Sequence, residues 1–299
     1  MNRFTLNQLS FLSGLPQQTI LFWNKKYNAL GYKDENFKDK YSTDDLHRIL
    51  NISTLFHLNK KYDLQTICLW ENTRLATTVE IELLTNFIHH EDVINQLVAS
   101  CLTYNEKRFN LIIDITLKKI PMIKFYEEIL YPFLLRIYST FSDKHEKPVQ
   151  FFYMKNLLKR KFYTLIDKKS GYINKTNTVL LFLPENEFNE IGLLFCNLIL
   201  IELGYKTYYI GPNQKIKAIE QAIRDLNPNL LISYIPSKEN YFSYKETLNH
   251  FDSYEKNLIL FGAKPNLESF KYSNFLKISD LQTLHETLEI YETKKVELI

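Results

Sequence analysis

The sequence predicts a mixed chain, with an N-terminal helix-turn-helix, a central four-helix bundle and a C-terminal doubly wound parallel α/β region. Apolar residues recur at helical spacing through the first half. Short, unbroken apolar runs alternate with helical segments in the last third, which is typical of strands buried in a parallel sheet. The 299 residues, 45% of them hydrophobic, are enough for two or three domains with cores of their own.

The net charge, the cysteines and the length of the apolar runs limit the classes of protein to which the chain can belong. The formal net charge of +3 neither demands nor excludes nucleic acid as a partner. The three cysteines, Cys68, Cys101 and Cys196, lie far apart among apolar neighbours, which favours buried thiols over disulfides or a metal site. No run of about 18 apolar residues and no signal-peptide pattern is present, so a cytoplasmic protein without a membrane partner is expected. No constellation of catalytic residues is evident, and no enzyme is expected.

A βαβ unit opens the C-terminal third. Val179–Leu183 suits a buried strand, and the helical pattern after it ends at Gly204, a residue that accepts a left-handed conformation. Tyr205–Ile210 suits a second strand. Open α/β sheets bind ligands at the loop between the first strand and the helix. Further elements are expected at Lys215–Leu226 (helix), Leu230–Tyr234 (strand), Tyr244–Phe251 (helix), Leu258–Phe261 and Phe275–Ile278 (strands) and Asp280–Lys294 (helix).

The N-terminus contains two short helical patterns joined by a glycine turn. Thr5 can cap the first, whose apolar face carries Leu6, Leu9 and Leu12. Ser13-Gly14-Leu15 is a turn, and Pro16 suits the start of the second helix. This arrangement predicts a helix-turn-helix.

The second helix and the segment after it resemble the N-terminal domain of MerR-type regulators. Seven residues match or nearly match that family's second helix: Thr19, Ile20, Phe22, Trp23, Lys25, Lys26 and Tyr27. Tyr41-Ser42-x-x-Asp45-Leu46 matches the pattern with which the family leaves its wing. The resemblance implies a winged helix-turn-helix over residues 1–75 that contacts double-stranded DNA. The expected contacts are Thr19, Lys25, Lys26, Tyr27, Lys38, Lys40 and Tyr41.

Two positions depart from the MerR pattern. Leu21 and Asp39 stand where that family has arginine. Lost phosphate contacts weaken DNA binding, because fewer counterions are released. The interpretation that these helices serve protein contacts therefore stays open.

The middle of the chain reads as helical. Glu91–Asp167 holds four amphipathic patterns, which predict a small bundle over residues 80–168. Asn72–Glu80 is polar and is expected to be a linker.

The C-terminal turn resembles the cobalamin-binding domain of methionine synthases and of cobalamin-dependent photoreceptor regulators. Glu187-x-Asn189-x-x-Gly192 has the family's spacing, but Asn189 replaces the histidine that is the lower cobalt ligand, and a carboxamide is a poorer ligand than imidazole. Ser233 matches the family's serine beside the nucleotide tail. A later Gly-Gly that makes room for this tail is Phe261-Gly262 here. The resemblance implies a Rossmann-like domain over residues 176–299.

The order of the three regions is that of the cobalamin-dependent light-sensing repressors of carotenoid genes. Their bundle covers the upper face of cobalamin with a Trp-x9-Glu-His motif, whose positions are Phe141, Phe151 and Phe152 here. These phenylalanines are expected to pack in a core. The clustered acids Glu185, Glu187 and Glu190 are expected to cap the following helix rather than to do acid–base work.

These patterns together predict a DNA-binding transcriptional regulator whose sensor region no longer binds cobalamin. No cofactor is expected, and the scaffold is expected to serve homo-oligomerisation or a protein partner. A light-sensing repressor that does bind cobalamin, and an interaction protein that does not bind DNA, are the alternatives. A cobalamin enzyme such as a methyltransferase or mutase ranks last, because the cobalt ligand and a substrate barrel are missing.

Overall fold

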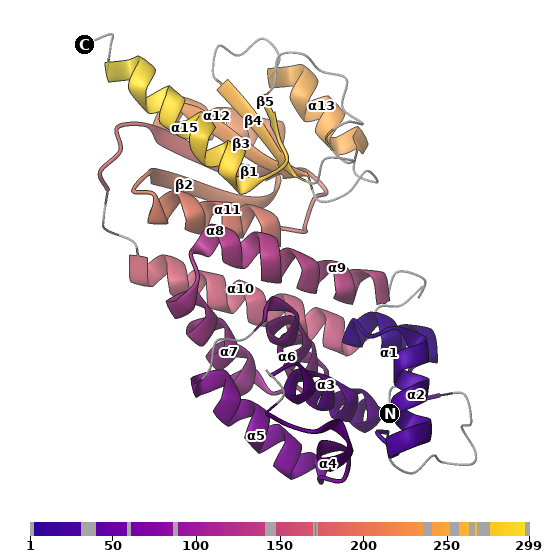
Figure 1. Cartoon of the computed structure of the whole chain (residues 1–299). Helices are drawn as coiled ribbons and strands as arrows, with labels where there is room; N and C mark the ends of the chain where they lie inside the picture. Colours follow the sequence, from indigo (N-terminus) through magenta and orange to yellow (C-terminus); the bar gives the residue numbers. More distant parts are fainter. Residues whose placement is uncertain are drawn as a thin grey trace. The chain divides into compact units, whose positions relative to one another are not determined.

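The computed structural model describes residues 3–30, 40–58, 61–85, 89–140, 148–169, 171, 173–235, 241–251, 257–262, 267 and 276–296 (Figure 1). The chain divides into two compact units, Met1–Leu157 and Leu158–Ile299. The boundary falls inside one long helix, and each unit is described by itself. The predicted three-way division at 1–75, 80–168 and 176–299 stays a prediction. Within the described ranges, no helix is both long and apolar enough to cross a membrane.

The first unit begins with five helices: α1 (Leu6–Ser13), α2 (Gln17–Tyr27), α3 (Thr43–His57), α4 (Leu64–Cys68) and α5 (Asn72–Thr85). Thr5 caps α1 in a reciprocal capping box with Gln8, as its position predicts. Gly14 lies in the turn between α1 and α2 with φ of 69°, where a side chain would strain the backbone. Phe4 and Tyr41 pair through two backbone hydrogen bonds of 2.8 Å, which join the start of the chain to the segment before α3.

The expected linker at Asn72–Glu80 is wrong, because these residues form most of α5. Leu75 and Val79 are fully buried one helical turn apart. Two apolar residues at that spacing are enough to anchor one face of a helix, and the polar residues around them belong to its solvent side.

The remaining helices of the first unit confirm the four helical segments expected over Glu91–Asp167. They are α6 (His90–Leu102), α7 (Glu106–Lys119), a third helix in three stretches and α10 (Val149–Lys169). The third helix comprises α8 (Met122–Phe125), a π-helical turn η2 (Tyr126–Leu130) and α9 (Tyr131–Thr140).

Helix α3 packs against α6 through polar as well as apolar groups. The buried amide of Gln96 donates to Thr54 at 2.9 Å and accepts from the buried Arg108 guanidinium at 2.6 Å. The ring of His57 lies 3.1 Å from a carboxylate oxygen of the fully buried Asp92. This hydrogen bond raises the pKa of His57, while burial raises the pKa of Asp92.

The second unit is a five-stranded parallel sheet with the order β2-β1-β3-β4-β5. The strands are β1 (Thr178–Pro184), β2 (Lys206–Gln214), β3 (Leu230–Ile235), β4 (Asn257–Gly262) and β5 (Leu276–Ile278). The helices are α11 (Ile191–Glu202), α12 (Ile216–Leu226), α13 (Tyr241–Phe251) and α15 (Leu281–Val296). Each expected element of this region is present, and the alternation of strands and helices confirms the doubly wound α/β fold. The strand order reverses at β1, which places a topological switch point at its carboxyl end.

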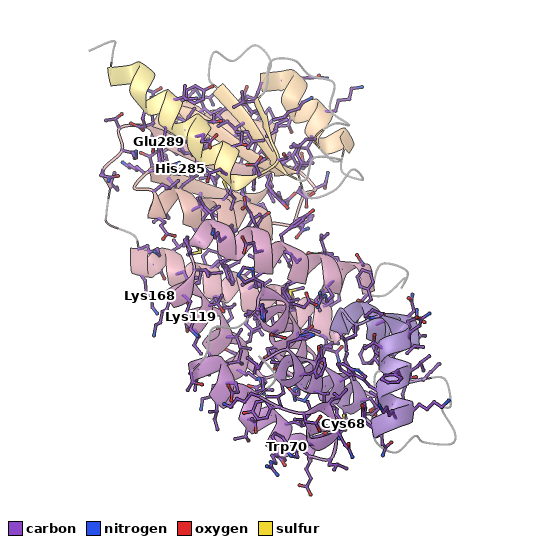
Figure 2. The ribbon with its side chains drawn as sticks, in the orientation of Figure 1. Cys68, Trp70, Lys119, Lys168, His285 and Glu289 are labelled. Carbon is purple, nitrogen blue, oxygen red and sulfur yellow. The ribbon has the colours of Figure 1, made fainter. Side chains whose placement is uncertain are left out.

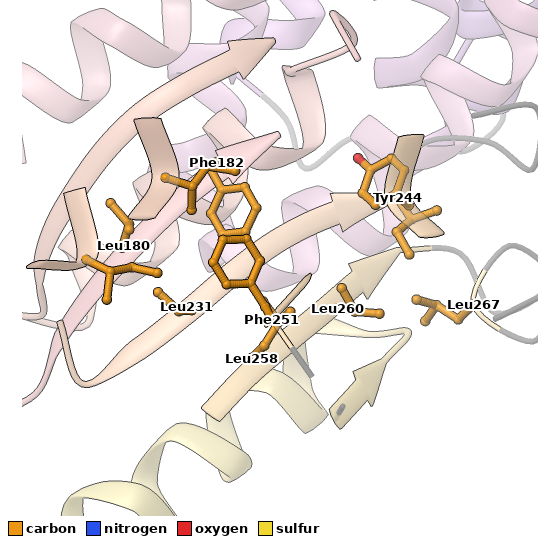
Figure 3. Packing of buried hydrophobic residues seen from close by; sticks show 11 residues of the cluster. Leu180, Phe182, Leu231, Tyr244, Phe251, Leu258, Leu260 and Leu267 are labelled. Carbon is orange, nitrogen blue, oxygen red and sulfur yellow. The ribbon is translucent and has the colours of Figure 1, made fainter. Parts of the chain in front are cut away.

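Apolar side chains of alternate strand positions fill one side of this sheet (Figure 3). Phe182 of β1 lies with its ring centroid 6.2 Å from that of Phe251 on α13. Helix α11 packs on the other side of the sheet, and its residues 191–200 are all buried. The last part of α10 belongs to this unit too, because Phe162 packs edge-on against Phe195 of α11 at 5.4 Å.

Candidate functional site

Helix α2 presents one face to the core of the first unit and the opposite face to solvent. Ile20 and Trp23 are buried. Leu21 and Phe22 are 46% and 54% exposed, although both are large and apolar. The solvent face consists of Gln17, Gln18, Leu21, Phe22, Lys25 and Lys26. Such exposure on a short helix beside a turn needs an explanation.

The positive charge of this face lies at the C-terminal end of α2. Lys25 and Lys26 are in the last helical turn, and both are exposed. The ammonium of Lys26 lies 5.5 Å from the ring centroid of Phe22 and 5.0 Å from that of Tyr27. The two rings meet edge-on at 6.3 Å. The aromatic pair therefore makes cation–π contacts with the ammonium of Lys26.

The residues predicted to contact DNA differ in how far they are exposed to solvent. Lys25, Lys26 and Lys40 are exposed, and Thr19 and Tyr27 are half-buried. Tyr41 is only 4% exposed, so its ring packs in the core while its backbone pairs with Phe4. Lys38 lies outside the described residues, as does Asp39. A role for each of these residues in DNA binding stays a prediction.

Two bundle helices hold the turn between α1 and α2. Arg136 of α9 donates to both carboxylate oxygens of Glu91 on α6, at 2.7 and 3.0 Å. A methyl group added to Gly14 would lie 2.0 Å from the same carboxylate. The backbone of the turn thus rests directly on this ion pair, and only glycine fits there.

The second candidate site is the turn from β1 to α11, at the switch point of the sheet. The carboxylate of Glu187 is buried and accepts a hydrogen bond of 2.6 Å from the backbone N–H of Asn189. Asn189 itself is half-buried. The backbone carbonyl of Glu187 accepts from the N–H of Asn213, and the N–H of Asn186 donates to the Asn213 side chain, both at 2.9 Å. The turn after β1 is therefore tied to the carboxyl end of β2.

Glu190 is fastened to helix α10 and to strand β2. Its carboxylate lies 2.6 Å from the ammonium of Lys159 on α10 and accepts from the hydroxyl of Tyr209 at 2.7 Å. Burial, and then the Glu190 charge, raise the pKa of Tyr209 far above its ordinary range. Glu190 occupies the N-cap position of α11 but makes no side-chain capping bond. The expectation that Glu190 caps this helix through its side chain is therefore wrong, because Lys159 and Tyr209 take the carboxylate.

An aromatic ring fills the space beside Gly192. A methyl group added to this glycine would lie 2.2 Å from the ring of Tyr234, the residue that follows Ser233 on β3. Tyr234 also packs against Phe261 of β4 at 5.7 Å between centroids. The glycine of the turn and the ring of Tyr234 thus fit together. Tyr234 is not among the site residues that the sequence predicts, although it directly follows Ser233.

The remaining positions matched to the cobalamin family serve the packing of the sheet. Ser233 is buried and donates to the carbonyl of Phe182 at 2.9 Å. Phe261 is 1% exposed. A methyl group on Gly262 would lie 2.6 Å from the carbonyl oxygen of Ile235, so β3 and β4 approach closely there.

The phenylalanines matched to the cap motif differ in burial. Phe151 is buried and meets Tyr138 edge-on at 4.9 Å, as core packing predicts. Phe152 is 52% exposed, so the expectation that it packs in a core is wrong. The two residues are adjacent on a helix and point in different directions. Phe141 lies outside the described residues.

The cysteines and potential metal ligands offer no further site. Cys68, Cys101 and Cys196 are buried, and burial raises the pKa of each thiol (Cys68 is labelled in Figure 2). In the described part of the chain, no three His, Cys, Asp or Glu side chains are grouped so that they could hold a metal ion.

The chain was compared with known proteins. No protein-family model and no curated protein matches the sequence. The solved structure of the monomethylamine corrinoid protein of Methanosarcina barkeri is similar, with a TM-score of 0.51 and 12% identity over 67% of this chain and 95% of that chain.

Two other solved structures have a TM-score of 0.32. One is a cobalamin-binding protein of Desulfitobacterium hafniense, with 14% identity over 62% of this chain and 91% of that one. The other is the methanol:cobalamin methyltransferase complex MtaBC of Methanosarcina barkeri, with 10% identity over 74% and 89%. Of these three structures, only the corrinoid protein is similar enough to support a statement about fold. The chain contains a cobalamin-binding-like fold.

Proposed function

We propose that this chain is a DNA-binding transcriptional regulator of MerR-like type whose cobalamin-binding-like region holds no cobalamin and serves oligomerisation or partner binding. The observation that carries the proposal is the solvent face of α2. It ends in two exposed lysines and lies directly after the Gly14 turn. DNA-binding proteins of the helix-turn-helix class place their second helix in the major groove, and lysines at such positions neutralise phosphates.

The charge on this face favours DNA over an ordinary solvated helix as the explanation for it. Lys25 and Lys26 have no acidic partner among the described residues, and no acidic residue lies on α2 itself. An ordinary solvated helix usually mixes both signs, whereas a face that carries only cations suits a polyanion. The rings of Phe22 and Tyr27 also help to hold the ammonium of Lys26 in place through cation–π contacts.

The absence of cobalamin is supported by a test of fit on the described residues. The turn presents the carboxamide of Asn189 in place of an imidazole, which is a poor ligand for cobalt. The ring of Tyr234 lies against Gly192 and Phe261, in the part of the fold where the family's nucleotide tail is expected. Glu190 is bound to Lys159 and Tyr209. These residues do not fit the cofactor.

A gel-shift titration with the full chain and the promoter region of its own gene tests the DNA-binding part. Replacing Lys25→Glu together with Lys26→Glu should abolish the shift, because two phosphate contacts become repulsive. Leu21→Arg should strengthen it by adding a cation. Lys215→Glu with Lys217→Glu on α12 makes the same change in net charge on exposed residues of the other unit and should leave the shift unchanged. A double α2 variant that binds as tightly as the parent would show that this face does not contact DNA.

A non-DNA-binding interaction protein is the second candidate. The exposed apolar pair Leu21 and Phe22 favours it, because such residues also suit a protein partner. The same titration separates the two candidates, since an interaction protein shifts no duplex at any salt concentration.

A further inference from the structure

The side chains at the centre of the α2 face are of the chemical types that suit A·T base pairs. Gln18, Leu21, Phe22 and Lys25 follow one another at i, i+3, i+4 and i+7, so they share one stripe of the helix. All four are exposed. Their chemistry runs along the helix from an amide, through two apolar groups, to a cation.

The amide and the apolar groups stand in the N-terminal half, which is the part of a recognition helix that contacts base edges. Glutamine pairs with the N6 and N7 atoms of adenine, and apolar side chains contact the methyl group of thymine. Arginine, the commonest reader of guanine, is absent from α2. Among the described residues the amide of Gln18 has no hydrogen-bond partner, whereas Gln17 already donates to Asn7 at 3.2 Å.

The cations of the α2 face stand in its C-terminal half. Lys25 and Lys26 are within the last turn of α2. Cations at that end suit phosphate oxygens rather than base edges. The N-terminal half of the α2 face is therefore neutral and suits base edges. The C-terminal half is charged and suits phosphates.

We propose that α2 selects A·T-rich duplexes, with Leu21 and Phe22 recognising thymine methyl groups and Gln18 recognising adenine. This inference rests on the proposed function and specifies the class of DNA that the same face binds. It explains why two large apolar side chains are left in solvent beside lysines: the partner that covers them carries methyl groups and negative charge together. A protein partner would be apolar or acidic but would show no dependence on a thymine methyl group.

The test begins with selection of the tightest duplexes from a random pool by the full chain. Thymines of the selected duplex are then replaced one at a time by deoxyuridine, which removes only the 5-methyl group. Binding by the parent should weaken roughly fourfold for each methyl that is buried. In each of the variants Leu21→Ala and Phe22→Ala, one position of the duplex should lose its methyl dependence. The variant should bind duplexes with thymine or deoxyuridine at that position equally. Gln18→Ala should become insensitive to 7-deazaadenine, which lacks the N7 acceptor.

Phe11→Ala is the matched control, because Phe11 is a similarly exposed phenylalanine (49%) on the neighbouring helix α1. It should keep the full thymine preference. The replaced side chains are all exposed, so equal thermal midpoints of parent and variants confirm that folding is intact. Binding without any loss on deoxyuridine substitution, or selection of G·C-rich duplexes, overturns the inference while the proposed function remains. Failure to select any duplex at low salt overturns the proposed function as well.

Discussion

At the scale of single residues, the ring of Tyr234 fits against Gly192, and a methyl group on this glycine would lie 2.2 Å from the ring. In an exposed helix, replacing glycine by alanine is favourable by roughly 1 kcal/mol. Here the overlap should reverse that sign.

We expect Gly192→Ala to lower the free energy of unfolding by about 1–3 kcal/mol, because the half-buried ring of Tyr234 must move away from its packing against Phe261. Tyr234→Ala removes the ring and leaves a cavity, which costs stability by itself. In that background Gly192→Ala should be neutral or stabilising. Denaturant unfolding of the parent, both single variants and the double variant gives the coupling energy. Costs that simply add would show that the two residues do not touch.

At the scale of elements, the interface between α3 and its neighbours combines apolar packing with buried polar groups. His47 of α3 is the member most sensitive to acid. Burial, and then the guanidinium of Arg108, lower the pKa of His47 to about 4, and Asp44 opposes them only in part. Its Nε2 atom is buried without a hydrogen-bond partner among the described residues.

A folded pKa below the unfolded value of 6.5 means that the folded state favours the neutral ring. The contribution of His47 to stability is therefore complete above pH 6.5 and is lost as the pH falls towards 4. The loss amounts to at most about 3 kcal/mol. His47→Gln should remove this part of the acid destabilisation, as measured by the unfolding free energy at pH 4.5 and pH 7. The His57–Asp92 pair is present in both proteins, so its titration cancels. His285→Gln should follow the parent, and an identical acid response of His47→Gln would contradict the assignment.

At the scale of the whole molecule, the elements could be predicted from the sequence better than the contacts between them. Apolar periodicity located the helices of the first unit and the strands of the sheet, because the pattern of burial along one element depends on the element itself. Asn72–Glu80 was taken for a linker since only Leu75 and Val79 anchor it, and two residues make a weak pattern. The contacts of Glu190 with Lys159 and Tyr209 could not be predicted, because they join segments far apart in the sequence.

In the candidate sites, too, features of a single element could be predicted from the sequence, whereas contacts between elements could not. Spacing alone placed Asn189 in a turn at the end of β1, and the exposure of Lys25 and Lys26 follows from their side of α2. Tyr234 could not be singled out from the sequence, because an aromatic residue on a buried strand is ordinary. Its importance follows only from the position of its ring against Gly192. The burial of Tyr41 could not be predicted from the sequence either, since a tyrosine can turn either its ring or its hydroxyl to solvent.

The last prediction concerns the cofactor. We expect the full chain, mixed with excess adenosylcobalamin or methylcobalamin in the dark and desalted, to show no cobalamin absorbance. Light should change neither its oligomer size nor its DNA binding. Asn189→His supplies an imidazole but leaves the ring of Tyr234 against Gly192, so this substitution alone should not restore binding.

Asn189→His combined with Tyr234→Gly and Phe261→Gly removes both rings as well, and any gain of cobalamin should appear in this variant first. The matched control is Tyr234→Gly with Phe261→Gly, which opens the same space without the ligand and should stay colourless. Circular dichroism must show that both variants keep their folded structure, since two large core side chains have been removed. A red parent protein, or a light-dependent change in its oligomer size, would contradict the loss of cobalamin and favour the light-sensing alternative, because a cofactor that binds must find room beside Tyr234.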